Sequence, residues 1–137
     1  MHAPPEMATQ RLPIRTEATE QEALFDFLNR IQPRVPAVAW AFHVPNGGAR
    51  HKATAVALKR QGVKRGVPDV LLPLRRGEYT GFACELKVGE NTTSHEQRLW
   101  LEVLKRQGWV TVVCWNWPDA AKALLVYLGE APEDFGL

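Results

Sequence analysis

Two apolar runs separated by a single dipeptide constrain the fold more than any other feature of this 137-residue sequence. DVLLPLRR occupies residues 69–76 and YTGFACELKV occupies residues 79–88, with only Gly-Glu between them. Short apolar runs on either side of such a turn predict an antiparallel β-hairpin. Pro73 interrupts the first run. Because proline cannot donate to a strand ladder, it predicts an edge position or a bulge there.

Three charged side chains stand where a sheet favours apolar ones. A turn centred on Gly77 pairs Asp69 with Glu85, with Cβ atoms about 4.5–5.5 Å apart. Two like charges at that separation are destabilising unless a cation lies between them. Lys87 shares the strand face of Glu85, because side chains two residues apart point the same way. Carboxylates without His or Cys nearby favour a hard ion such as Mg²⁺ or Mn²⁺.

Such a group of charges can support metal-assisted hydrolysis of a phosphodiester. The ion supplies an activated water and neutralises charge on a phosphoryl oxygen, while the adjacent lysine stabilises the transition state. The alternative is structural: the charges lie at an exposed strand end and form surface pairs with arginines.

The remaining patterns predict one α/β domain. Amphipathic spacing and terminating Gly or Pro residues predict helices over residues 16–32, 52–61, 92–108 and 118–128. Apolar runs predict further strands over residues 37–44 and 109–115, the latter buried. Ser94 and Gln97 have capping-box spacing, and Pro118 suits a first helical turn.

Composition excludes several classes of protein. A content of 45% hydrophobic and 23% charged residues is ordinary for a folded soluble domain. No apolar run approaches the roughly 20 residues that span a bilayer, and the start of the sequence lacks the apolar stretch of a signal peptide. We therefore expect a cytoplasmic protein with no membrane partner. Cys84 and Cys114 lack metal-ligand spacing and are expected to be buried thiols.

Positive charge is concentrated in one segment, although the net charge is only +2. Residues 50–65 contain no acid and six cations: Arg50, Lys52, Lys59, Arg60, Lys64 and Arg65. This segment is either a phosphate-contacting surface or an ordinary solvated helix face.

The motifs around these residues resemble a known nuclease family. GVPD at 66–69 followed by ELK at 85–87 is similar to the PD-(D/E)xK nuclease signature. Further stretches occur in the order seen in VRR-NUC domains, especially small stand-alone phage and bacterial members: HVPNGG at 43–48, GVKRGVPDVLLP at 62–73, HEQRLWLEVLKRQGW at 95–109 and ALLVYL at 123–128. The resemblance covers residues 16–129. It leaves 1–15 as a flexible arm and 130–137 as a loose acidic tail.

The resemblance implies a restriction-endonuclease-like core, with a mixed central sheet of about four strands flanked by helices. It implies that Asp69 and Glu85 bind the metal, with the Leu86 carbonyl as an extra ligand, and that Lys87 is the catalytic lysine.

Relatives often carry a further glutamate on the first helix. Glu17 is favoured here as a further metal ligand and catalytic acid, because its spacing from Gln21 continues the stripe that leads to Leu24. Glu20 is the reserve. Either acid could instead serve only the helix dipole.

Gln97 matches a glutamine that follows the ExK strand in VRR-NUC relatives, where it would position the lysine or the water. Capping alone also explains it. The loop after the first core strand offers His43 and Asn46 as substrate contacts, although a plain turn is equally consistent with it. Phosphate contacts are expected from the basic segment, at Arg50, Lys52, Lys59 and Lys64.

These features together predict a metal-dependent DNA endonuclease, of a bacterial cell or a phage-infected host. The resemblance implies structure-selective cleavage of branched DNA such as four-way junctions or flaps, by a homodimer. The sequence supplies aromatic area for a dimer contact in five tryptophans: Trp40, Trp100, Trp109, Trp115 and Trp117. The alternatives are a general repair or restriction-like nuclease with the same site, and a catalytically silent nucleic-acid-binding domain.

Overall fold

The computed structural model describes residues 14–45 and 52–137. Its elements in chain order are α1 (Glu17–Ile31), η1 (Pro36–Trp40), β1 (Phe42–His43), α2 (Lys52–Arg60), β2 (Val70–Leu72), β3 (Gly81–Leu86), α3 (His95–Arg106), β4 (Trp109–Cys114), α4 (Trp117–Tyr127) and η2 (Pro132–Phe135). The strands form one sheet in the order β1-β2-β3-β4. The first two pairs are antiparallel and the last is parallel. The predicted mixed α/β sheet flanked by helices is confirmed.

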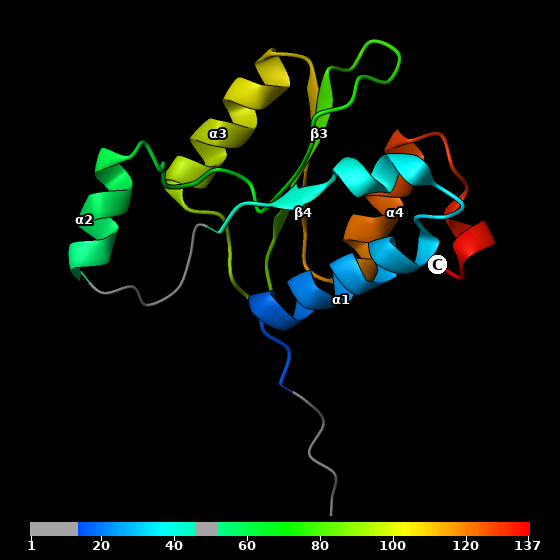
Figure 1. The fold of residues 1–137 in the computed structure, drawn as a ribbon, viewed down its shortest axis with the longest axis horizontal. Coiled ribbons are helices and arrows are strands. Elements are labelled where there is room, and N and C mark those ends of the chain that lie inside the picture. The colour runs from blue at the N-terminus through cyan, green and yellow to red at the C-terminus, as the bar shows by residue number, and fades with distance from the viewer. Residues whose placement is uncertain (1–13, 46–51) are drawn as a thin grey trace, which may run out of the picture.

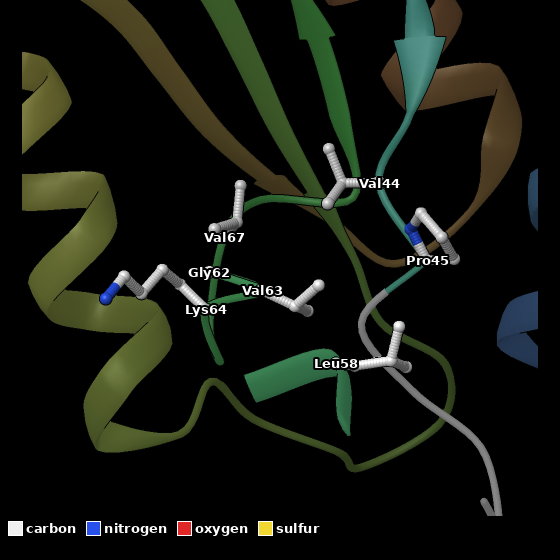
Figure 2. Close-up of a pocket in the computed structure, with 7 residues that line it drawn as sticks. All are labelled: Val44, Pro45, Leu58, Gly62, Val63, Lys64 and Val67. Carbon is white, nitrogen blue, oxygen red and sulfur yellow. The ribbon is translucent and has the colours of Figure 1, made fainter. Parts of the chain in front are cut away.

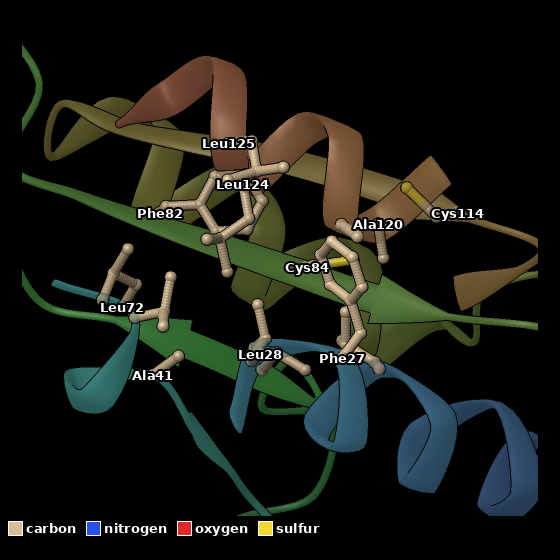
Figure 3. Packing of buried hydrophobic residues seen from close by; sticks show 14 of the residues in the cluster. Phe27, Leu28, Ala41, Leu72, Phe82, Cys84, Cys114, Ala120, Leu124 and Leu125 are labelled. Atoms are coloured by element: carbon tan, nitrogen blue, oxygen red, sulfur yellow. The ribbon is translucent and has the colours of Figure 1, made fainter. Parts of the chain in front are cut away.

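One face of the sheet carries the hydrophobic core. α1 and α4 pack together over this face, and α3 lies on the other side (Figure 1). Alternate residues of β3, Phe82, Cys84 and Leu86, point into the core, where they meet Leu28 and Leu124 (Figure 3). Cys84 and Cys114 are free and buried, as expected.

The strand predicted over residues 37–44 is wrong for most of its length. Residues Pro36–Trp40 form the 3₁₀ helix η1, and only Phe42–His43 pair as a strand. Pro36 suits the first turn of a helix, and Val35, Val38 and Ala41 recur every three residues on the buried side. That period of three places the apolar residues of the run on one face more effectively than strand alternation would.

β4 is less buried than we predicted. It is the terminal strand of the sheet, and only Cys114 among its residues is buried. α3 packs on it but is itself amphipathic, with no fully buried residue. One edge of β4 is therefore left without a neighbouring strand in the described part of the chain.

The C-terminal residues form structure rather than the loose tail we expected. Pro132–Phe135 make the 3₁₀ helix η2, which contacts α4. Phe135 and Leu137 pack against the core, and the Arg34 guanidinium lies 4.3 Å from the centroid of the Phe135 ring. Of the predicted flexible arm over residues 1–15, residues 1–13 lie outside the described residues.

Candidate active site

The hairpin register brings two acids to opposite positions on neighbouring strands. Val70 pairs with Cys84 and Leu72 with Phe82, so the next pair along the ladder is Asp69 and Glu85, as the sequence predicted. Nearer the turn, Arg76 bridges to Tyr79. Between this bridge and the Leu72–Phe82 pair lie three residues on the first strand, 73–75, and two residues on the second, 80–81. The extra residue lies within 73–75, a stretch that begins at Pro73, where we expected an edge position or a bulge.

Asp69 is held by the end of β3. The backbone N–H of Leu86 donates to Asp69 Oδ2 at 2.8 Å. The next residue, Lys87, turns its N–H the other way and donates to the Cys114 carbonyl at 2.8 Å. Because the N–H and C=O of one strand residue point to the same side, the Leu86 carbonyl also faces Asp69. The Leu86 carbonyl and the Asp69 carboxylate therefore lie on the same side of β3.

Glu85 is buried, and one of its two carboxyl oxygens has no hydrogen-bond donor. The residue is 1% exposed. Its Oε1 accepts from Gln97 Nε2 at 2.8 Å and lies 3.7 Å from Lys87 Nζ. Its Oε2 is buried and has no hydrogen-bond partner. Burial, and then the neighbouring Asp69 carboxylate, raise the pKa of Glu85 from 4.5 to about 9.

These features indicate that positive charge belongs in the gap beside Glu85. The raised pKa of Glu85 favours the protonated form of this carboxyl group when no cation is bound. Among residues 14–45 and 52–137, no group of three His, Cys, Asp or Glu side chains is arranged to hold a metal ion. Two carboxylates, one backbone carbonyl and several waters nevertheless make a donor set suited to Mg²⁺, which keeps much of its hydration shell in proteins.

Gln97 has two contacts that share one amide. Its Oε1 accepts from the Ser94 backbone N–H at 2.7 Å and completes the capping box at the start of α3. This contact turns Nε2 toward Glu85. The capping and site interpretations of Gln97 are therefore compatible in one conformation.

Lys87 joins the acids to the start of α1. Its side chain is buried, and Nζ lies 3.9 Å from Glu17 Oε1 as well as near Glu85. Glu20 is directed elsewhere: Arg15 Nε donates to its Oε1 at 2.6 Å, and Arg15 also donates to the Trp115 carbonyl. The structure thus brings Glu17, not Glu20, to the group around Lys87.

Comparison with known proteins identifies the family. The sequence profile of the VRR-NUC domain matches residues 15–116. The chain belongs to the VRR-NUC domain family. A solved structure described as a VRR_NUC domain protein superimposes with a TM-score of 0.70 at 25% sequence identity, covering 86% of this chain and 92% of that one. No curated protein matches the sequence. The VRR-NUC domain is a nuclease-type domain, which implies DNA as its substrate.

Gly66 of the VRR-NUC domain has a role in the site that sequence reasoning did not single out. Its φ is +85°, and a Cβ placed there would lie 2.6 Å from the backbone carbon of Glu96. Only glycine lets the segment before Asp69 pass this close to the start of α3. That approach brings Gln97 within reach of Glu85. The signal available in the sequence was the glycine of GVPD itself.

The predicted DNA contacts are only partly described. His43 Nδ1 lies 2.8 Å from the Asp69 backbone carbonyl, but His43 pairs with Val70, so the strand register assigns its side chain to the face opposite the acids. Lys52, Lys59 and Lys64 are exposed. Asn46 and Arg50 lie outside the described residues.

α2, which carries part of the basic segment, stands away from the sheet (Figure 1). None of its residues is buried. A cavity of about 420 Å³ separates Leu58 and the following turn from Val44, Pro45 and Val67 (Figure 2). The cavity is lined mainly by apolar side chains and does not include the acids.

No described helix has the length and apolar character required to cross a membrane.

The two hydrogen bonds of the Gln97 side-chain amide lead to a prediction for this VRR-NUC site. Gln97→Glu retains an N3 residue able to complete the capping box but directs a second carboxylate at Glu85. We expect thermal stability close to wild type and DNA cleavage about 10- to 100-fold slower, as for loss of a group that orients a metal ligand. Thermal unfolding and single-turnover cleavage measure the two effects. Cleavage at the wild-type rate would show that Gln97 acts only as a cap.

The two acids of α1 form a matched pair of variants. Glu17→Gln is expected to slow cleavage about 10- to 100-fold, because it removes the second carboxylate near Lys87. Glu20→Gln should leave cleavage unchanged. It should instead lower the free energy of unfolding by about 1–3 kcal/mol, because its Arg15 contact is weakened in a buried setting. The opposite pattern would assign the site to Glu20.

Proposed function

We propose that this protein is a metal-dependent DNA endonuclease that hydrolyses phosphodiester bonds, with Mg²⁺ or Mn²⁺ as cofactor. The observation that carries the proposal is the buried Oε2 of Glu85, which has no donor and lies beside the Asp69 carboxylate. Two acids are stable in that arrangement only when positive charge lies between them. Asp69, Glu85 and the Leu86 carbonyl would hold the ion.

Each residue around the ion has a proposed part in the reaction. A bound divalent ion supplies a water of lowered pKa and positive charge for the phosphoryl oxygens. Lys87 holds its ammonium group at the edge of the gap and stabilises negative charge that develops on the phosphate. Gln97 fixes the rotamer of Glu85, and Glu17 holds Lys87 in place.

We further propose that the DNA is branched and that two copies of the chain act together. The described residues form one nuclease core, with no helix-turn-helix or zinc module that would read base sequence. A nuclease core without such a module is consistent with selection of DNA by its shape rather than by its base sequence. The half-buried edge strand β4 offers backbone groups and apolar side chains to a second copy.

A cleavage panel tests the proposal. A four-way junction, a flap and a plain duplex are each incubated with Mg²⁺, with Mn²⁺ and with EDTA. We expect cleavage with either metal and none with EDTA, with the branched substrates cut fastest. Equal cleavage of plain duplex would support the general repair or restriction-like nuclease instead. Tight binding without cleavage under any condition would support the silent binding domain.

A further inference from the structure

The sheet carries two exposed aromatic side chains beside the candidate active site. Trp40 at the end of η1 is 65% exposed, and Phe42 in β1 is 46% exposed. Trp40 is the last residue of η1 and Phe42 is the first residue of β1, with buried Ala41 between them. We name Trp40 and Phe42 together the aromatic ridge. Contiguous exposed apolar surface on a protein often marks a binding site.

The strand register places Phe42, the β1 member of the aromatic ridge, on the face that carries the acids. Phe42 pairs with Leu71, which pairs with Ala83, so these three side chains form one row across the sheet. Asp69 and Glu85 form the next row on the same face, which is also the face contacted by Gln97 of α3. Neighbouring rows on one face are about 6.6 Å apart. Among residues 14–45 and 52–137, α3 packs on β4, and Phe42 stays exposed at the β1 edge of this face.

The position of Phe42 limits what can cover it. A second protein seated on this row would lie one step from Asp69 and Glu85 and would obstruct the approach of a phosphodiester. A nucleotide attached to the phosphate being cut would have its base within reach of the row. The occupant that is compatible with the site is therefore the DNA itself.

The charges nearby fit the same occupant. Lys64 and Arg65 are exposed on the segment that leads to Asp69. That segment is tied to α3, because Trp100 Nε1 donates to the Arg65 carbonyl at 3.0 Å. Cations that follow a sugar-phosphate backbone, next to aromatic rings on which bases stack, are typical of surfaces that bind unpaired strands.

We propose that the aromatic ridge is a stacking platform for unpaired bases next to the scissile phosphate. In paired duplex the base faces are already stacked on one another, so only nucleotides outside a duplex can use the platform. The ridge would thus direct the enzyme to cuts adjacent to unpaired DNA. This inference rests on the proposed function, since it assumes that the phosphate binds at Asp69 and Glu85.

Binding in EDTA tests the platform without cleavage. Fluorescence anisotropy measures the dissociation constants of a single strand, a flap and a plain duplex for Trp40→Ala and Phe42→Ala at one salt concentration. Each variant is expected to bind the single strand and the flap about tenfold more weakly, with no matching loss for the duplex. Phe42→Tyr retains the ring and should bind as wild type does. Tyr79→Ala removes an aromatic side chain that is 51% exposed at the hairpin turn, away from the acids, and serves as the matched control.

Three results would overturn the inference. Unchanged binding of unpaired DNA by both alanine variants would do so, and so would an equal loss for all three DNAs. A variant that becomes monomeric by light scattering while keeping its affinity for unpaired DNA would make the ridge a contact between copies. Failure of the proposed function is separable: wild-type protein that cleaves nothing would still show the binding pattern if the platform exists.

Discussion

Glu85→Gln is expected to lower metal-dependent cleavage about 1,000-fold or more, because a neutral amide cannot complete the charge that holds the ion, and an ion supplies several kcal/mol of transition-state stabilisation. The same variant should make the metal-free protein more stable at neutral pH. Wild-type Glu85 is buried beside Asp69 and has one oxygen without a donor. The amide carries no charge and can still accept from Gln97.

The pH dependence of stability follows from the pKa of Glu85. Its folded-state pKa of about 9 is above the ordinary value of 4.5, so the unfolded chain releases this proton at lower pH than the folded chain does. Between these two values, the free energy of unfolding therefore falls as pH rises. In EDTA, the melting temperature should decline from about pH 5 to about pH 9 for wild type and much less for Glu85→Gln.

The matched control for this experiment is Glu78→Gln. Glu78 is an exposed acid in the hairpin turn, and its replacement should reproduce the wild-type pH dependence and the wild-type cleavage. Added Mg²⁺ should raise the melting temperature of wild type and of the control but not of Glu85→Gln. A variant that keeps both its cleavage and its response to Mg²⁺ would remove Glu85 from the metal site.

Lys87→Met is expected to lower kcat about 100- to 1,000-fold, with little change in KM for DNA. Methionine preserves most of the buried apolar stem and removes the ammonium group that lies 3.7 Å from Glu85 Oε1. A charge that acts mainly on the transition state affects kcat rather than binding of the ground state. The loss should persist at saturating Mg²⁺, because Lys87 is not one of the proposed ligands.

Lys59→Met separates this effect from general loss of positive charge. Lys59 is exposed on α2 and is expected to contact phosphate away from the cut. Its replacement should raise KM and flatten the salt dependence of binding by about one unit, with kcat unchanged. If Lys87→Met shows that same pattern, Lys87 is a DNA contact and not part of the chemistry.

Local sequence rules succeeded where the structure depends on neighbouring residues. The Gly-Glu turn and the apolar runs around it predict the hairpin, and the predicted pairing of Asp69 with Glu85 is correct. That register also depends on the extra residue within 73–75, because the Arg76–Tyr79 bridge alone would pair Asp69 with Leu86. The Ser94 cap and the position of Pro118 in the first turn of α4 were also correct, since both depend on residues within one helical turn. These short-range features account for most of the helix boundaries.

The sequence rules failed where burial depends on distant elements. The local sequence of residues 37–44 is compatible with either a strand or a 3₁₀ helix. Packing of Val35, Val38 and Ala41 against the core selects the helix. The C-terminal residues are composed like a loose tail, yet η2 is held by α4 and by the contact between Arg34 and Phe135.

The sequence by itself determined that Glu85 and Lys87 share one strand face of a hairpin that also carries Asp69, because side-chain alternation and hairpin formation follow from local sequence. Only the tertiary structure decided what surrounds them. Packing of α1 and α3 at the end of β3 selected Glu17 over Glu20, turned Gln97 toward Glu85 and left Phe42 uncovered. The physical reason is that burial and charge environment depend on contacts between elements far apart in the chain, which no local pattern encodes.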